Sequence, residues 1–162
     1  MAVPLLVRLV SLKNLHPILT HFTNGITPAA LALALLARST RLLGYIPLSH
    51  IVIPSCVDVA AWLMMVFVAG ITPLTMATGM IDWKYRYDMR KVPVIQRKVI
   101  TALAGYVFVI VYVVSHSISD YSLIALGIAL FFFAVTGDYG GRLVHGAANA
   151  SLLKKFQKPG TR

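Results

Sequence analysis

The sequence predicts an all-α, integral membrane four-helix bundle, and its composition and hydropathy pattern both support that fold class. Hydrophobic residues make up 58% of the 162 residues and charged residues only 12%, whereas a soluble domain carries roughly 25% charged residues. The mean hydropathy is +0.78. Four apolar stretches are each long enough to cross the roughly 30 Å hydrocarbon core of a bilayer as a helix. They leave no room for a separate soluble domain, so one bundle is expected to form the whole protein.

Residues 1–15 precede the first apolar stretch and are expected to lie at the membrane interface or to pack on a partner. This segment is basic through Arg8 and Lys13, and its apolar run is short and broken by Pro4. A secretory signal peptide would need a longer apolar core and a small-residue cleavage site. We therefore predict a retained amphipathic segment, followed by a four-span domain over residues 16–146.

The first span is expected at about residues 17–37, where Pro17 suits a first helical turn. Pro28 should kink this helix or leave a carbonyl unpaired. His21, Asn24 and Pro28 are three and four residues apart, so they share one helix face. His16 precedes His21 by five residues and points to another side of the helix, so the two histidines are not an automatic chelating pair.

The second span is expected at about residues 57–80. Asp58 lies near its start, where the helix dipole favours a carboxylate. The far half of this span is polar and small, which suits close helix packing and the rescue of backbone groups freed by a proline. We expect that half to face the bundle interior; its residues are Thr72, Pro73, Thr75, Thr78 and Gly79.

The third and fourth spans are expected at about residues 99–115 and 121–136, and a basic tail over residues 147–162 follows. With four spans both chain ends lie on the same side of the membrane. Only Arg38 and Arg41 of the 15 lysines and arginines fall on the opposite side. The positive-inside rule then places both termini on the cytoplasmic side of a cell inner membrane. The excess of cations indicates contact with anionic lipid, and the missing soluble basic surface argues against nucleic-acid binding.

Histidines near two helix ends suggest where chemistry could occur. Imidazoles from different helices hold b-type haem in membrane bundles, and cations meet the propionates. We take His21 and His145 as the candidate haem iron ligands, with His16 supporting or substituting for one of them. Arg142 or Arg90 would meet a propionate.

Each of these residues also has a simpler interpretation. Histidines at a membrane interface commonly hydrogen-bond backbone or lipid, and Asn24 is typical of an interhelical hydrogen bond. Asp58 suits a helix start better than proton transfer, and Asp138 with the glycines after it suits a helix C-terminal turn. His50 and His116 could form a second site on the far side.

Other classes of chemistry find less support in the sequence. No carboxylate stands at zinc or iron ligand spacing from His16 or His21. No nucleophile arrangement or phosphate-binding loop is present, so the protein is at most a redox subunit of a larger enzyme. A solute or proton transporter is expected to contain internal repeats or acidic residues deep in the spans, and the sequence has neither.

Three short motifs resemble those of a family of uncharacterised bacterial four-helix membrane proteins. They are His16-Pro17-Ile18-Leu19-Thr20-His21-Phe22, Gly79-Met80-Ile81-Asp82-Trp83 and Gly140-Gly141-Arg142-Leu143-Val144-His145-Gly146. The resemblance extends from about Leu15 to Gly146. Related chains occur fused to Rieske-type iron–sulfur domains, which implies membrane redox work, and the match makes His16, His21, Asp82 and His145 the family-type polar positions.

Two departures from the family pattern bear on this prediction. Thr23 follows Phe22 where the family usually has proline, and Gln96, Arg97 and Lys98 stand where a histidine is expected near the start of the third span. If that histidine is a ligand in relatives, this chain either pairs His21 with His145 or has lost the site.

The sequence therefore predicts a membrane subunit of a respiratory or photosynthetic electron-transfer complex. It would bind haem b, exchange electrons with quinone and depend on other membrane or redox subunits. The alternative is a cofactor-free membrane anchor or assembly subunit of a larger complex.

Overall fold

The computed structural model describes residues 15–43, 54–116 and 121–145. These ranges form four α-helices, α2 (Leu15–Leu43), α3 (Pro54–Tyr87), α4 (Pro93–Ser115) and α5 (Ser122–His145), and contain no strand. Each helix contains a stretch long and apolar enough to cross a membrane. The all-α fold with four membrane-spanning helices is therefore confirmed. The expected interfacial segment, apart from Leu15, and the basic tail over residues 147–162 lie outside the described residues.

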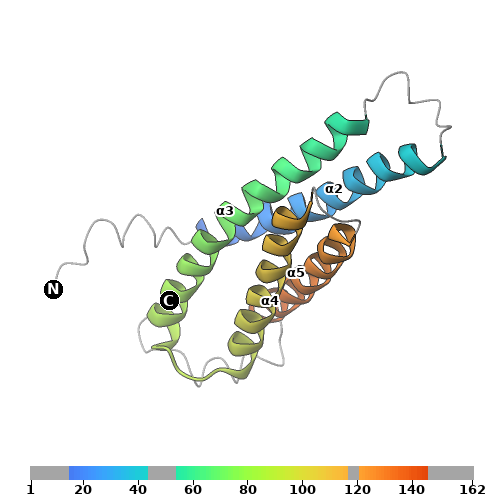
Figure 1. The fold of residues 1–162 in the computed structure, drawn as a ribbon. Helices are drawn as coiled ribbons and strands as arrows, with labels where there is room; N and C mark the ends of the chain where they lie inside the picture. Colours follow the sequence, from blue (N-terminus) through green and yellow to red (C-terminus); the bar gives the residue numbers. More distant parts are fainter. Residues whose placement is uncertain (1–14, 44–53, 117–120, 146–162) are drawn as a thin grey trace.

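The helices form two hairpins, α2 with α3 and α4 with α5 (Figure 1). The hairpins meet where α2 contacts α5 and where α3 contacts α4. Neighbouring helices run in opposite directions, because α2 begins beside the end of α3 and ends beside the start of α5. We call the end where α2 and α4 begin and α3 and α5 end the motif end, and the other the opposite end.

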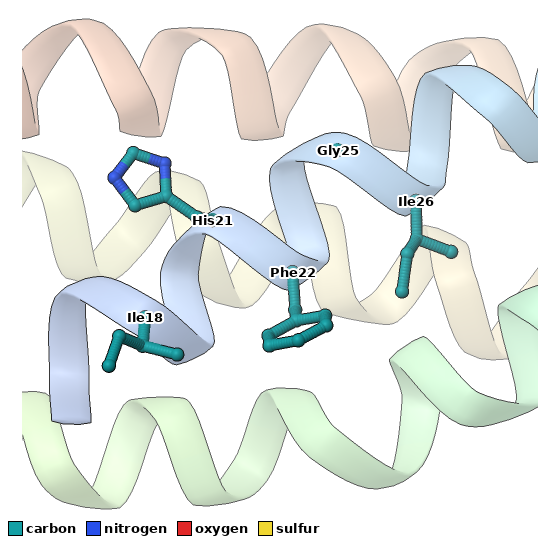
Figure 2. Close-up of a pocket in the computed structure, with 5 residues that line it drawn as sticks. All are labelled: Ile18, His21, Phe22, Gly25 and Ile26. Atoms are coloured by element: carbon teal, nitrogen blue, oxygen red, sulfur yellow. The ribbon is translucent and has the colours of Figure 1, made fainter.

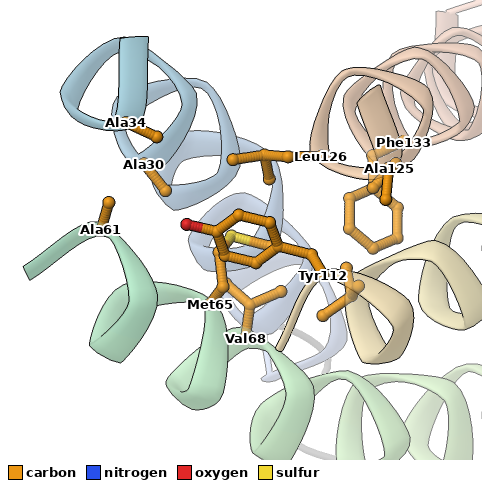
Figure 3. Close-up of a cluster of buried hydrophobic side chains, with 11 residues drawn as sticks. Ala30, Ala34, Ala61, Met65, Val68, Tyr112, Ala125, Leu126 and Phe133 are labelled. Carbon is orange, nitrogen blue, oxygen red and sulfur yellow. The ribbon is translucent and has the colours of Figure 1, made fainter. Parts of the chain in front are cut away.

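Small side chains let α2 and α3 approach each other closely. Ala30, Ala34 and Ala61 are at most 1% exposed. Small residues at helix interfaces allow the close backbone approach that van der Waals packing requires in a membrane. The buried cluster around them is completed by residues of α3, α4 and α5, which are Met65, Val68, Val109, Tyr112, Ala125, Leu126, Ala129 and Phe133 (Figure 3).

Both α2 and α3 continue as helices through an internal proline, Pro28 and Pro73. The residue before each proline is a buried threonine whose hydroxyl bonds back to a carbonyl one turn earlier. Thr27 Oγ1 donates to Thr23 O at 2.7 Å, and Thr72 Oγ1 donates to Val68 O at 2.6 Å. Such bonds help to satisfy the polar groups of proline-containing membrane helices.

The threonines in the far half of α3 face inward, as its composition predicted, whereas Pro73 of the same half is exposed. Thr72, Thr75 and Thr78 are all buried, at 4–8% exposure. Their hydroxyls donate to carbonyls of their own helix. This half of α3 therefore offers α2 a small, hydrogen-bonded surface at the motif end.

A tight turn joins α3 to α4 at the motif end. Asp88 and Met89 both have positive φ, at 52° and 56°. The Trp83 Nε1–H donates to the Arg90 carbonyl at 3.1 Å and ties the end of α3 to the turn. Buried Val92 then precedes Pro93 at the start of α4.

Candidate functional site

His16 joins the start of α2 to the end of α3. Its Nδ1 lies 3.1 Å from the Thr75 carbonyl oxygen and 3.3 Å from Thr78 Oγ1. The imidazole packs directly on Gly79, because a Cβ atom at position 79 would lie 2.8 Å from His16 Cε1. A carbonyl partner makes Nδ1 the protonated nitrogen. Two of the three sequence motifs thus meet in one helix contact.

His21 has a different environment, because it is exposed on the outer surface of α2. It lines a shallow, open hollow with apolar neighbours of the same helix, which are Ile18, Phe22, Gly25 and Ile26 (Figure 2). Ile18 and Phe22 are themselves about half exposed. His21 therefore lies on a surface that faces lipid or a partner.

The third motif ends α5 at the same end of the bundle. His145 is the last residue of α5, and its side chain lies outside the described part of the chain. The Arg142 guanidinium is exposed and its Nε lies 2.8 Å from Asp138 Oδ2, one turn earlier on the same helix. Arg90 is exposed in the turn between α3 and α4. The pairing of His21 with His145 remains a prediction.

The contact between α2 and α5 limits where a flat cofactor could lie. A Cβ atom at Gly137 of α5 would lie 3.3 Å from Asn24 Nδ2 of α2. At this depth the two helices touch, so a porphyrin between them would have to separate them. Among the described residues, no three or more histidine, cysteine or acidic side chains gather as metal ligands.

Lys98 connects three helices at the motif end. This half-buried residue of α4 interacts electrostatically with Asp82 of α3. Its Nζ also lies 3.6 Å from the Cβ position of Gly140 on α5. Lys98 is one of the three residues that stand where the family pattern has a histidine, and the cations of this region were expected in water or against anionic lipid. The structure instead packs this lysine against motif residues of two neighbouring helices.

A second polar cluster lies at the opposite end, and we call Asp58, Trp62, Tyr112 and His116 the aromatic–histidine cluster. His116 Nε2 lies 3.6 Å from Asp58 Oδ2, and both side chains are less than one-fifth exposed. The His116 ring stacks on Trp62, with 6.3 Å between centroids, and is tilted against Tyr112 at 5.5 Å. Trp62 Nε1–H donates to the Val113 carbonyl at 3.0 Å.

Arg38 and Ser122 extend this cluster to the other two helices. The Arg38 Nη2 donates to Ser122 Oγ at 3.3 Å and links α2 to the start of α5. Asp58 thus does more than begin a helix, because its carboxylate faces the His116 imidazole of α4 at 3.6 Å. His50, which was expected to share a second site with His116, lies outside the described residues.

Sequence reasoning missed the role of Tyr112 and Trp62, although their spacing carried a signal. Trp62 follows Asp58 by four residues and His116 follows Tyr112 by four. Residues four apart share a helix face. Two such pairs at the same membrane level could have identified the cluster before the structure did.

Comparison with known proteins finds a relative whose description gives no activity. A protein of Archaeoglobus fulgidus, described as an uncharacterized protein, is 70% identical over 95 residues, which are 59% of this chain and 85% of that protein. No family model and no solved structure matches. An uncharacterised relative agrees with the expected uncharacterised family, although this one is archaeal and the family was expected to be bacterial.

Proposed function

This chain belongs to the same family as the uncharacterised Archaeoglobus fulgidus protein, and we propose that it is a membrane anchor or assembly subunit of a larger complex. The observation that carries this proposal is the exposed His21 within a membrane-spanning helix. We call the surface formed by Ile18, His21, Phe22, Gly25 and Ile26 the His21 patch.

An exposed imidazole in a membrane span is expensive to surround with hydrocarbon, and such residues usually mark a functional contact. His21 lies in the candidate span from His16 to Ser39. Its neighbours Ile18 and Phe22 are 48% and 49% exposed. A partner helix with a hydrogen-bonding side chain would cover the apolar residues and also form a hydrogen bond with the imidazole.

The other motif residues support the anchor proposal because they pack within the bundle. His16 of the first motif fills the space beside Gly79 of the second, and Gly140 of the third lies near Lys98 of α4. These contacts give the motif residues a structural reason to occur at these positions. Ile18, His21 and Phe22 of the first motif are exposed and remain available to another subunit.

Purification from native membranes in mild detergent tests this proposal. We expect the wild-type chain to migrate with a partner subunit, and the His21→Leu and Phe22→Ala variants to lose that partner. Phe131→Ala is the matched control, because Phe131 is 63% exposed on α5, away from the patch, and its loss should leave the complex intact. A wild-type chain that purifies without any partner would contradict the proposal.

A redox subunit that binds haem b is a second candidate function, and the exposure of His21 favours it. Haem supplies reversible one-electron transfer when bound. His21 would hold the haem iron and its apolar neighbours would cover part of the haem, and a partner subunit would have to cover the rest. In this proposal His145 is the second ligand, with His16 as its substitute, and Arg142 or Arg90 meets a propionate. Quinone would be the redox partner.

A pyridine haemochrome spectrum of the purified complex separates the two candidates. A stoichiometric b-type signal that disappears in His21→Ala would support the redox subunit. A colourless complex that retains its partner would leave the anchor. We further propose an inner-membrane location with both termini cytoplasmic and the basic motif end against anionic lipid.

A further inference from the structure

The aromatic–histidine cluster contains a buried polar atom that the protein itself does not satisfy. Tyr112 is 1% exposed, and its hydroxyl finds no hydrogen-bond partner among the residues that the structure describes. Figure 3 shows the phenol in the core, with its oxygen directed to the side where Ala30 and Ala61 lie. These methyl groups neither donate nor accept. Leaving a buried hydroxyl unpaired is costly, because the group has lost its hydrogen bonds to water.

A second unsatisfied atom lies one helical turn away. His116 Nδ1 is buried and also lacks a hydrogen-bond partner within the described ranges. The other ring nitrogen, Nε2, faces the Asp58 carboxylate, and a carboxylate favours the proton on the nitrogen nearest to it. In the neutral ring Nδ1 is then a bare acceptor, so the cluster presents one unused donor and one unused acceptor.

The two rings that carry this donor and this acceptor lie close together. Tyr112 and His116 are four residues apart on the same face of the helix, and their ring centroids are 5.5 Å apart. Asp58 and Arg38 also interact electrostatically with Tyr112. Among the described residues, the charged groups that act on Tyr112 are thus Asp58 of α3 and Arg38 of α2, and Arg38 in turn donates to Ser122 of α5.

The chemistry of the two atoms selects the group that they would bind. A carbonyl oxygen or an anion could accept from Tyr112 but could not donate to His116 Nδ1. A hydroxyl oxygen does both, because it accepts at its lone pairs and donates its proton. It also brings no net charge into a membrane interior, where charge is costly.

We propose that Tyr112 and His116 form a binding site for a hydroxyl oxygen, supplied either by water or by a small phenol or alcohol. The Tyr112 O–H donates a hydrogen bond to this oxygen. The O–H group of the bound molecule donates a hydrogen bond to His116 Nδ1. Asp58 orients the imidazole through Nε2, and Trp62 stacks on the ring and holds it in place. This site lies at the opposite end from the His21 patch and does not depend on the function proposed above.

The Tyr112→Phe variant tests the site by the sign of its effect, because phenylalanine keeps the ring and removes only the hydroxyl. If the hydroxyl binds a partner oxygen, its loss should lower Tm in detergent by roughly 2–8 °C. If the hydroxyl is truly unpaired, its removal should leave Tm unchanged or raise it. Tyr106→Phe is the control, because Tyr106 is a half-buried tyrosine of the same helix and its loss should leave Tm unchanged.

Direct detection distinguishes the two sources of the oxygen. In protein with ¹⁵N-labelled histidine, the His116 Nδ1 resonance should move on the Tyr112→Phe substitution and should show exchange with a hydroxyl proton in the wild type. A stoichiometric phenol or alcohol in a solvent extract, lost from Tyr112→Phe, would identify an organic ligand, and an extract without one would identify water. An unchanged or raised Tm with an unmoved Nδ1 resonance would overturn the proposal.

Discussion

The His16 imidazole occupies the space beside Gly79 that any larger residue would fill. We predict that Gly79→Ala destabilises the fold by about 1–3 kcal/mol, the usual range for overpacking a tight contact. The new Cβ would lie 2.8 Å from His16 Cε1, so the ring must leave the Thr75 carbonyl. Reversible unfolding in mixed micelles, followed by circular dichroism, measures the free energy.

Gly70→Ala provides the control for this prediction, because no atom lies within 4 Å of a Cβ at position 70 of the same helix. There alanine should stabilise, since it is the better helix former. An equal response of Gly70→Ala and Gly79→Ala would show that the His16 contact contributes nothing.

The turn between α3 and α4 holds Met89 at a φ of 56°, a left-handed conformation that costs a non-glycine residue roughly 1–2 kcal/mol. Glycine adopts it freely, and the Met89 side chain is 43% exposed, so little packing would be lost. Met89→Gly should therefore raise the unfolding free energy by up to about 1 kcal/mol. Arg90→Gly, at a neighbouring exposed position with ordinary φ, should give no gain in the same unfolding assay.

At the scale of the helices, the α4–α5 hairpin depends on a glycine that faces an aromatic ring. A Cβ atom at Gly105 would lie 2.8 Å from Phe133 Cδ1 and Cε1. Gly105→Ala should destabilise by about 1–3 kcal/mol, and the loss should shrink when Phe133→Leu is introduced as well, because the ring then no longer blocks the methyl group. A double-mutant cycle of unfolding free energies measures this coupling, and full additivity would contradict the assigned contact.

The four helices could be predicted from sequence because apolar length alone identifies a membrane span. Their packing faces could not, because lipid and protein interior are equally apolar. In α4 the buried positions include Gly105, Val109 and Tyr112, while Leu103 and Val107 are about half exposed. Hydropathy does not separate these two groups. The inward half of α3 was predictable only because threonines mark it.

The candidate site was likewise predictable only in part. The meeting of the motifs at one end followed from counting spans, and so it was predictable. The engagement of His16 with α3, and the contact of Lys98 with Gly140, depend on helix rotation, which the sequence pattern does not fix. The pairing of Asp58 with His116 likewise joins residues 58 positions apart; the four-residue spacings on α3 and α4 mark a polar face on each helix, but they do not show that these two faces meet.

At the scale of the whole molecule, charge asymmetry sets the proposed orientation. Of the lysines and arginines in the described helices and the α3–α4 turn, only Arg38 and Arg41 lie toward the opposite end. The positive-inside rule therefore favours a cytoplasmic motif end. The His21 patch then lies toward the cytoplasmic face, where a partner subunit would bind. The aromatic–histidine cluster lies toward the outer face, where a hydroxyl ligand would bind.

The single cysteine of the chain makes this orientation testable. Cys56 is exposed near the start of α3, at the opposite end from the α3–α4 turn. A membrane-impermeant maleimide should label it from outside intact cells. In a Cys56→Ser background, Lys91→Cys places a thiol in that turn, and it should react only after the membrane is permeabilised. The reverse labelling pattern would show that the bundle has the opposite orientation in the membrane. It would then put the basic motif end outside, so the excess of cations would need a cause other than insertion by the positive-inside rule.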